Sequence, residues 1–180
     1  MSPPNTPSVS APTEAPTRNA LPWLWLSLLI IALDQASKLH FLSVLEYGGP
    51  AITVIDGFWE WTLAKNFGAA FSFLAGASGW QRWFFSALAI GISALLVYWL
   101  RKMPRSYWHE ALPFALIIGG AIGNLIDRLR FGYVVDFVHW YWRDFSWPVF
   151  NVADSAIVAG AVLLVVASLF GGAHRGDGRR

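Results

Sequence analysis

The stretch GGAIGNLIDRLRFGYVVD, from Gly119 to Asp136, organises this chain, together with FNVADSAIVAG, from Phe150 to Gly160. Both segments border long apolar runs, yet they contain carboxylate, amide and guanidinium side chains. Ionisable groups at the edge of a bilayer core are costly, so they need a partner, a water-filled cavity or a chemical role. The polar side chains concerned are Asn124, Asp127, Arg128, Asp136, Asn151 and Asp154.

The composition of the 180 residues is typical of a membrane protein. Hydrophobic residues make up 56% of the chain and charged residues only 13%, whereas soluble domains carry roughly 25% charged residues. The 11 tryptophans suit anchoring at two membrane interfaces. The net charge of +2 is too small, without any basic stripe, to indicate nucleic-acid binding. With no cysteine in the sequence, disulfides and a cysteine nucleophile are excluded.

Four apolar runs are long enough to cross a bilayer. The first begins at Leu21, and the others extend over residues 83–100, 110–126 and 149–170. A basic residue before the first run also fits a signal peptide, but no small-residue cleavage site follows, so we expect a retained helix. We therefore expect one four-helix transmembrane domain over residues 21–172, between a disordered tail (1–20) and a basic tail (173–180).

Residues 46–79, between the first two runs, have a different pattern. Gly48-Gly49-Pro50 and Asp56-Gly57 are turn signals. The segments ITVI (52–55) and FWEWTLA (58–64) have the β-branched and aromatic residues typical of strands. We therefore expect a small extramembrane β element. The later segment HWYWRDFSW, residues 139–147, instead looks like a stretch that lies in the plane of the membrane interface.

The basic residues predict the orientation, because cytoplasmic loops carry an excess of lysine and arginine. The tails and the loop 101–105 lie on one side if there are four spans, and that side is therefore predicted to be cytoplasmic. The β element then faces outward, and three helices bring polar residues to one depth near the outer surface. The opposite loops also hold basic residues, so the bias is modest. The residues that set it are Arg18, Arg101, Lys102, Arg105, Arg175, Arg179 and Arg180.

Asp136 and Asp154 are the pair with the clearest chemical meaning. Two carboxylates held close cannot both ionise easily, so one keeps a proton while the other is a base. Such a pair activates a water and protonates a developing oxyanion, as in an aspartic protease. The structural alternative is that Asp154 caps a helix and Asp136 pairs with Arg128 or Arg143. Spacing alone leaves both interpretations open.

The neighbouring polar residues also have simpler alternatives. Asn124, Asp127 and Arg128 occupy positions i, i+3 and i+4, so they share one helical side. The arginine either orients a carboxylate or reaches the headgroups from a locally satisfied helix end. Asp34 and Lys38 form an i, i+4 pair, which more often neutralises charge than performs chemistry.

Three further features carry weaker signals. Asn66 and Gly68 either bond a substrate backbone or form an ordinary turn. The glycines of Gly119–Gly123 are expected to permit close helix packing, because no phosphate-loop pattern surrounds them. We expect no metal, since the histidines are scattered without metal-binding spacing: His40, His109, His139 and His174.

Five short blocks occur in a fixed order along the predicted spans and loops: DQASK (34–38), NFGAAFS (66–72), GNLIDR (123–128), GYVVDF (132–137) and FNVAD (150–154). Each block alone is a weak signal. Together, in this order and on four spans, they resemble the bacterial lipoprotein signal peptidase (signal peptidase II) family. The resemblance covers roughly residues 21–170, and the N-terminal tail lies outside it.

The resemblance implies an intramembrane aspartic endopeptidase of the bacterial inner membrane. Such an enzyme removes the signal peptide from prolipoproteins after a diacylglyceryl group has been attached to the cysteine that follows the scissile bond, without a cofactor. Asp136 and Asp154 would be the catalytic pair and Asp127 a structural residue. The residues implied to position substrate and support the pair are Asp34, Lys38, Asn66, Gly68, Asn124, Arg128 and Asn151.

The implied fold is a helical (all-α) membrane protein, with four transmembrane helices, a periplasmic β-cradle and a short periplasmic interfacial helix. The site would lie near the periplasmic face, with both termini cytoplasmic. The expected partners are lipid-modified prolipoproteins and membrane lipids, and we expect a monomer.

Other classes of protein fit less well. A small proton-coupled transporter would carry polar residues through the full membrane depth, which the second span and the cytoplasmic halves of the others lack. A non-enzymatic scaffold would explain the aromatic residues but not the clustered acids. A presenilin-like protease would have a GxGD motif, which is absent from the sequence.

Overall fold

The computed structural model describes residues 19–68 and 79–171. Residues 1–18, the C-terminal tail and the last part of the expected β element lie outside these ranges. Asn19 and Ala20, which were expected to belong to the disordered tail, are instead ordered, and Ala20 is fully buried. A short 3-10 helix, η1, precedes four helices that are each long and apolar enough to cross a membrane, which confirms the predicted number of spans. The elements are η1 (Leu21–Trp23), α1 (Leu24–Val44), α2 (Trp80–Lys102), α3 (Trp108–Phe131) and α4 (Val152–Gly171).

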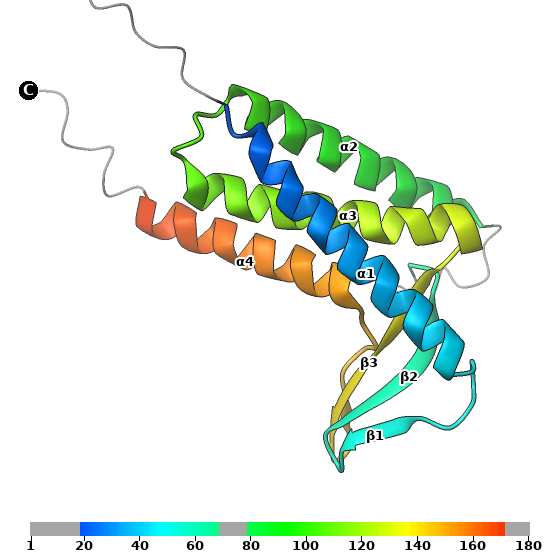
Figure 1. Cartoon of the computed structure of the whole chain (residues 1–180). Helices are drawn as coiled ribbons and strands as arrows, with labels where there is room; N and C mark the ends of the chain where they lie inside the picture. Colours follow the sequence, from blue (N-terminus) through cyan, green and yellow to red (C-terminus); the bar gives the residue numbers. More distant parts are fainter. Residues whose placement is uncertain (1–18, 69–78, 172–180) are drawn as a thin grey trace, which may run out of the picture.

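Helix α3 lies at the centre of the bundle and packs against the three other long helices (Figure 1). Of its most apolar stretch, 61% is buried, compared with 17–22% in the others. The other helices therefore expose apolar side chains around the outside, as surfaces that face lipid must. Helix α3 also continues to Phe131, beyond the predicted end at residue 126, and stops at Gly132 in the left-handed conformation (φ 86°). Asp127 and Arg128 therefore lie on the helix together with Asn124, as their i, i+3 and i+4 spacing predicted.

The glycines of α3 allow the helices to approach closely, as expected. A β-carbon on Gly120 would collide with the backbone oxygen of Ala153 in α4. A β-carbon on Gly123 would lie 2.6 Å from Oδ2 of Asp34 in α1. Small residues at these positions therefore bring three helix backbones together at one level.

Four antiparallel strands form one sheet in the order β1-β2-β3-β4. The first two strands confirm the β element predicted from ITVI and FWEWTLA. The other two were not predicted. The bounds are β1 (Ile52–Ile55), β2 (Trp59–Asn66), β3 (Val134–Trp142) and β4 (Phe145–Ser146).

Residues 139–147, expected to run along the interface, instead complete β3, turn and form β4. Strand β2 pairs with the first of these residues, with Glu60 opposite His139. Nδ1 of His139 lies 2.8 Å from Oε1 of Glu60, and its Nε2 lies 2.7 Å from Oγ of Ser146, so one side chain links three strands. Among the residues that the structure describes, only η1 and α1–α4 are helical, and the expected short outer helix is not among them.

The sheet covers one end of the helix bundle, where α1 and α3 end and α4 begins (Figure 1). The ring of Phe41, near the end of α1, stacks on Phe137 of β3 with centroids 4.3 Å apart. The backbone N–H groups of Phe137 and Val138 donate to the oxygen of Phe150 at 3.1 and 2.9 Å. Strand β3 is thus held between α1 and the entry to α4, which positions its central residues over the helix ends.

Gly120→Ala is expected to lower the thermal stability, because the added methyl group forces α3 and α4 apart. Overpacking of this kind costs about 1–3 kcal/mol. Gly91→Ala in α2 is the matched control, since a β-carbon there meets nothing within 4 Å. It should leave stability unchanged or raise it by roughly 0.5–1 kcal/mol. Thermal unfolding in one detergent compares them, and equal melting temperatures would contradict the close packing.

Candidate active site

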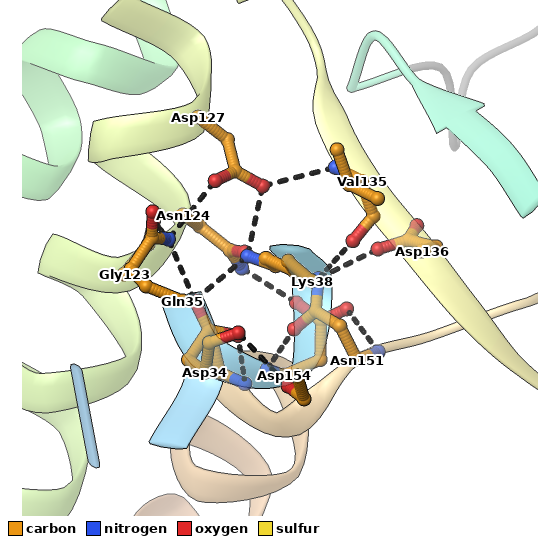
Figure 2. A network of polar contacts seen from close by, with 12 residues as sticks. Asp34, Gln35, Lys38, Gly123, Asn124, Asp127, Val135, Asp136, Asn151 and Asp154 are labelled. Carbon is orange, nitrogen blue, oxygen red and sulfur yellow. Dashed lines mark hydrogen bonds and ion pairs between the residues drawn. The ribbon is translucent and has the colours of Figure 1, made fainter. Parts of the chain in front are cut away.

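The polar residues singled out in the sequence gather where α1, α3, β3 and the start of α4 meet (Figure 2). Most are almost fully buried, and only Arg128 and Asp154 are partly exposed. The group combines residues far apart in the chain on four elements. Its members are Asp34, Lys38, Asn124, Asp127, Arg128, Asp136, Asn151 and Asp154.

Lys38 is the cation at the centre of this group and is only 2% exposed. Its Nζ lies 2.8 Å from Oδ2 of Asp34, 2.9 Å from Oδ2 of Asp127 and 3.0 Å from Oδ1 of Asn124. The ammonium group thus donates hydrogen bonds to Asp34 and Asn124 and forms ion pairs with both carboxylates. The predicted i, i+4 pair with Asp34 is therefore present, and Asp127 completes it from another helix.

Asp34 and Asp127 connect this cation to the backbone of other elements. Oδ1 of Asp34 accepts a hydrogen bond from the backbone N–H of Ala153, in the first turn of α4, at 3.0 Å. Oδ2 of Asp127 accepts one from the N–H of Val135 in β3 at 3.0 Å. These contacts fix the start of α4 and the start of β3, and they support the predicted structural role of Asp127.

Gln35 belongs to the same network, although we did not predict a role for it. Its Nε2 lies 3.1 Å from Oδ2 of Asp34, 3.0 Å from Oδ1 of Asp127 and 3.2 Å from the oxygen of Gly123. The available signal was its place in the DQASK block, beside a buried carboxylate. Its amide group links the two carboxylates that hold Lys38.

Asp154 caps α4, as the structural alternative predicted. Its backbone N–H donates to Oδ1 of Asn151 at 2.9 Å, and its Oδ2 accepts from the N–H of Asn151 at 3.3 Å. This reciprocal pair is a capping box. The other carboxylate oxygen, Oδ1, accepts a hydrogen bond from Nδ2 of Asn124 at 2.7 Å. Capping therefore occupies one oxygen and leaves the other directed into the polar group.

Two asparagine side chains connect Asp136 with Asp154. Nδ2 of Asn151 donates to Oδ1 of Asp136 at 2.6 Å and lies 3.1 Å from Oδ1 of Asn124. Asn124 in turn donates to Asp154 at 2.7 Å. Figure 2 shows both carboxylates turned toward this amide pair. The two aspartates thus belong to one hydrogen-bonded network.

The second structural alternative, an ion pair between Asp136 and an arginine, is not found. Among the described residues, neither Arg128 nor Arg143 lies within ion-pair distance of Asp136. The guanidinium of Arg128 donates to the backbone oxygen of Asn124 at 3.4 Å and lies 5.2 Å from the ring centroid of Phe85. Asp136 therefore makes no ion pair with either guanidinium.

Burial and, next to it, the nearby charge of Asp154 raise the pKa of Asp136 to about 7. Hydrogen bonds from the side chains of Asn66 and Asn151 lower the pKa in part. Near neutral pH, Asp136 therefore exists in both protonation states. A carboxyl group poised in this way is a candidate general acid or base.

Asn66 and Gly68 lie at the end of β2, beside the start of β3. The N–H of Gly68 donates to Oδ1 of Asn66 at 2.8 Å, which is the local turn that the sequence left as an alternative. Gly68 has a φ of 86°, and a β-carbon there would collide with the ring of Phe85. The turn needs glycine on both grounds, and the hydrogen bond of Asn66 to Asp136 connects it to the site.

The carboxylates of this group are divided between two sets of partners. Within residues 19–68 and 79–171, no three histidine or carboxylate side chains are grouped for a metal ion. The buried carboxylates nearest the centre, Asp34 and Asp127, already surround the ammonium of Lys38. The arrangement can therefore offer two further carboxyl groups, those of Asp136 and Asp154, for acid–base chemistry.

Comparison with known proteins gives a consistent result. Residues 26–170 match the family model described as signal peptidase (SPase) II. A lipoprotein signal peptidase of Xanthomonas oryzae pv. oryzae (strain PXO99A) is 57% identical over 159 residues, which cover 88% of this chain and 95% of the relative. One from Xylella fastidiosa (strain M12) is 58% identical over 156 residues, covering 87% and 93%.

A solved structure described as a bacterial membrane enzyme superposes with a TM-score of 0.76 at 29% sequence identity, covering 88% of this chain and 94% of that one. A second structure with the same description has a TM-score of 0.72 at 30% identity. With four apolar helices, these matches indicate a multi-pass protein of the bacterial inner membrane. The chain therefore belongs to the lipoprotein signal peptidase (signal peptidase II) family, whose members are aspartic-type peptidases.

Proposed function

We propose that this chain is the endopeptidase that cleaves the signal peptide from diacylglyceryl-modified prolipoproteins, on the N-terminal side of the lipidated cysteine. The observation that carries the proposal is the pair of carboxyl groups, Asp136 and Asp154, joined through two asparagine amides at the end of a membrane helix bundle. Membership of an aspartic peptidase family supports the same chemistry.

The proposed orientation places the sheet and the site at the periplasmic face and both termini in the cytoplasm. The basic loop between α2 and α3 supports it, because that loop lies at the end of the bundle away from the sheet (Figure 1). A diacylglyceryl group keeps the substrate cysteine at the outer interface, so the scissile bond reaches the aspartates without leaving the membrane. We propose that residues 21–172 act as one monomeric peptidase domain, in contact with membrane lipids.

In the proposed mechanism, Asp136 is the acid and Asp154 the base. The raised pKa of Asp136 lets it hold a proton near neutral pH. Asp154 accepts hydrogen bonds from Asn124 and Asn151 and lies in the first turn of α4, where the partial positive charge of the helix end stabilises a carboxylate. Asp154 takes a proton from water, the hydroxide attacks the carbonyl carbon, and Asp136 protonates the carbonyl oxygen.

Collapse of the tetrahedral intermediate breaks the peptide bond. Asp154 gives its proton to the leaving amino group of the lipidated cysteine, and Asp136 recovers the proton from the hydroxyl group as the new carboxyl end of the signal peptide forms. No metal or nucleotide takes part in the proposed steps. Asn124 and Asn151 fix the positions of the two carboxyl groups by hydrogen bonds. Asp34 and Lys38 stabilise the helices and the strand on which these residues lie. We propose that Asn66, Gly68 and Arg128 position the substrate.

Asp136→Asn and Asp154→Asn are each expected to yield a folded protein whose cleavage rate falls at least roughly a thousandfold, because either change removes one of two groups that act together. The assay uses a diacylglyceryl-modified prolipoprotein and its unlipidated form. The matched control is Asp56→Asn in the exposed turn between β1 and β2. Wild-type turnover by either dyad variant, or equal cleavage of the two substrates, would refute the proposal.

The pH dependence of kcat/KM should show an alkaline limb near pH 7, the pKa of Asp136. Below this pH Asp136 keeps the proton that the carbonyl oxygen needs, and above it the proton is lost, so activity falls as the pH rises. Initial rates at low substrate concentration, in buffers of equal ionic strength, measure the profile. A rate that stays level or rises across the alkaline range would show that Asp136 is not the acid.

Lys38→Met is expected to lower both stability and activity without abolishing activity. The change leaves Asp34 and Asp127 buried without their cation, and breaking a buried ion pair costs about 3–5 kcal/mol. The catalytic carboxyl groups remain, so residual cleavage is expected. Lys65→Met is the control, since Lys65 is exposed and lies over the rings of Tyr47 and Tyr133. Thermal unfolding and kcat/KM are measured, and equal stability of the two variants would contradict the central role of Lys38.

A further inference from the structure

A second polar feature lies at the end of the bundle away from the sheet (Figure 1). The turn between α2 and α3 borders a cavity of about 410 Å³, within the range of roughly 300–1,000 Å³ that is usual for small-molecule sites. Its wall contains one cation, Lys102, and one carboxylate, Glu110. The other lining residues are apolar or aromatic: Trp99, Met103, Pro104, Tyr107 and Phe114.

Backbone hydrogen bonds fix the turn that borders the cavity. The backbone N–H of Ala20, which is fully buried, donates to the carbonyl oxygens of Leu100 and Met103 at 3.1 and 3.0 Å. The N–H of Tyr107 donates to the oxygen of Pro104 at 3.1 Å. These bonds tie the turn to the start of α1 and to itself. The walls are thus held in place before a ligand arrives.

The two charged residues of the cavity are not paired with each other. Among the described residues, neither Lys102 nor Glu110 has an ion-pair partner within 4 Å. The ammonium of Lys102 lies 5.9 Å from the ring centroid of Tyr98. Each charge suits its helix end, since Lys102 is in the last turn of α2 and Glu110 in the first turn of α3. The interaction of each charge with its helix dipole does not, however, explain why the two charged side chains line the same apolar cavity.

The position of the cavity along the bilayer normal indicates which kind of ligand has access to it. It lies where two membrane-spanning helices end, at the level of lipid headgroups on that side of the bilayer. Exposed aromatic side chains surround it, with Trp99 at 44%, Tyr107 at 40% and Trp108 at 59% exposure. Tryptophan and tyrosine favour this level. A phospholipid can therefore enter the cavity from the bilayer.

We propose that this cavity binds a zwitterionic phospholipid that carries a phosphate and a primary ammonium group, the chemistry of phosphatidylethanolamine. Lys102 binds the phosphate, Glu110 accepts hydrogen bonds from the ammonium, and Trp99 and Phe114 contact the first part of an acyl chain. An anionic headgroup would satisfy Lys102 but be repelled by Glu110. A choline headgroup has no N–H to donate to the carboxylate. The site is separate from the peptidase chemistry and does not depend on which membrane face it occupies.

Native mass spectrometry of the purified full chain tests this, with phosphatidylethanolamine, phosphatidylcholine and phosphatidylglycerol of identical acyl chains added in turn. Phosphatidylethanolamine should be retained best. Lys102→Gln and Glu110→Gln should each weaken its binding by roughly tenfold, the effect of losing one hydrogen bond to a charged group. Arg101→Gln is the matched control, because it removes a neighbouring charge that does not line the cavity, and it should leave binding unchanged.

Lys102→Arg should restore binding, since it keeps the cation, and this shows that any loss in Lys102→Gln is not a folding defect. Equal retention of the three lipids would overturn the proposal. So would a loss in Arg101→Gln as large as in Lys102→Gln, which would indicate general surface charge. Higher binding of phosphatidylglycerol by Glu110→Gln, without loss of phosphatidylethanolamine, would show an anionic-lipid site instead.

Discussion

The ammonium group of Lys38 makes the contacts on which the sheet end of the bundle depends. It lies on α1, touches Asp127 and Asn124 of α3, and shares Asp34 with the backbone of α4. A buried cation is tolerated only when its charge is matched, and here two carboxylates and an amide oxygen lie within 3.0 Å of the ammonium. The contact also sets the relative depth of three helices, because a shift of any one along its axis would break it. Strand β3 joins the same arrangement through the bond from Val135 to Asp127.

The same side chains cap a helix and build the site. Asn151 and Asp154 form the capping box of α4, and their remaining atoms reach Asp136 and Asn124. A helix start is a suitable place for this, because its free N–H groups and partial positive charge hold a carboxylate in a defined position. The hydrogen bonds that cap α4 therefore also position the carboxyl groups of the proposed catalytic pair.

The charged side chains at the two ends of the bundle differ in their burial and pairing. At the sheet end, charges are buried, matched and linked to the backbone, and burial moves the pKa of Asp136 toward neutrality. At the other end, Lys102 and Glu110 line an open cavity without pairing. Between them, apolar helix faces fill the span. Polar chemistry is thus confined to the two interfaces, because unpaired charge is too costly in the hydrocarbon layer.

The sequence by itself determined the four spans, the first two strands and most members of the buried polar group, since apolar run length, alternation and short motifs are local properties. Only the tertiary structure decided the contacts between elements. The pair of Lys38 with Asp127 joins residues on α1 and α3, and it exists because small glycines let these helices meet. Residues 139–142 are strand because they pair with β2 on one side and β4 on the other, whereas their aromatic composition alone had indicated the membrane interface. Gln35 entered the site for the same reason: packing, not local pattern, placed its amide between two carboxylates.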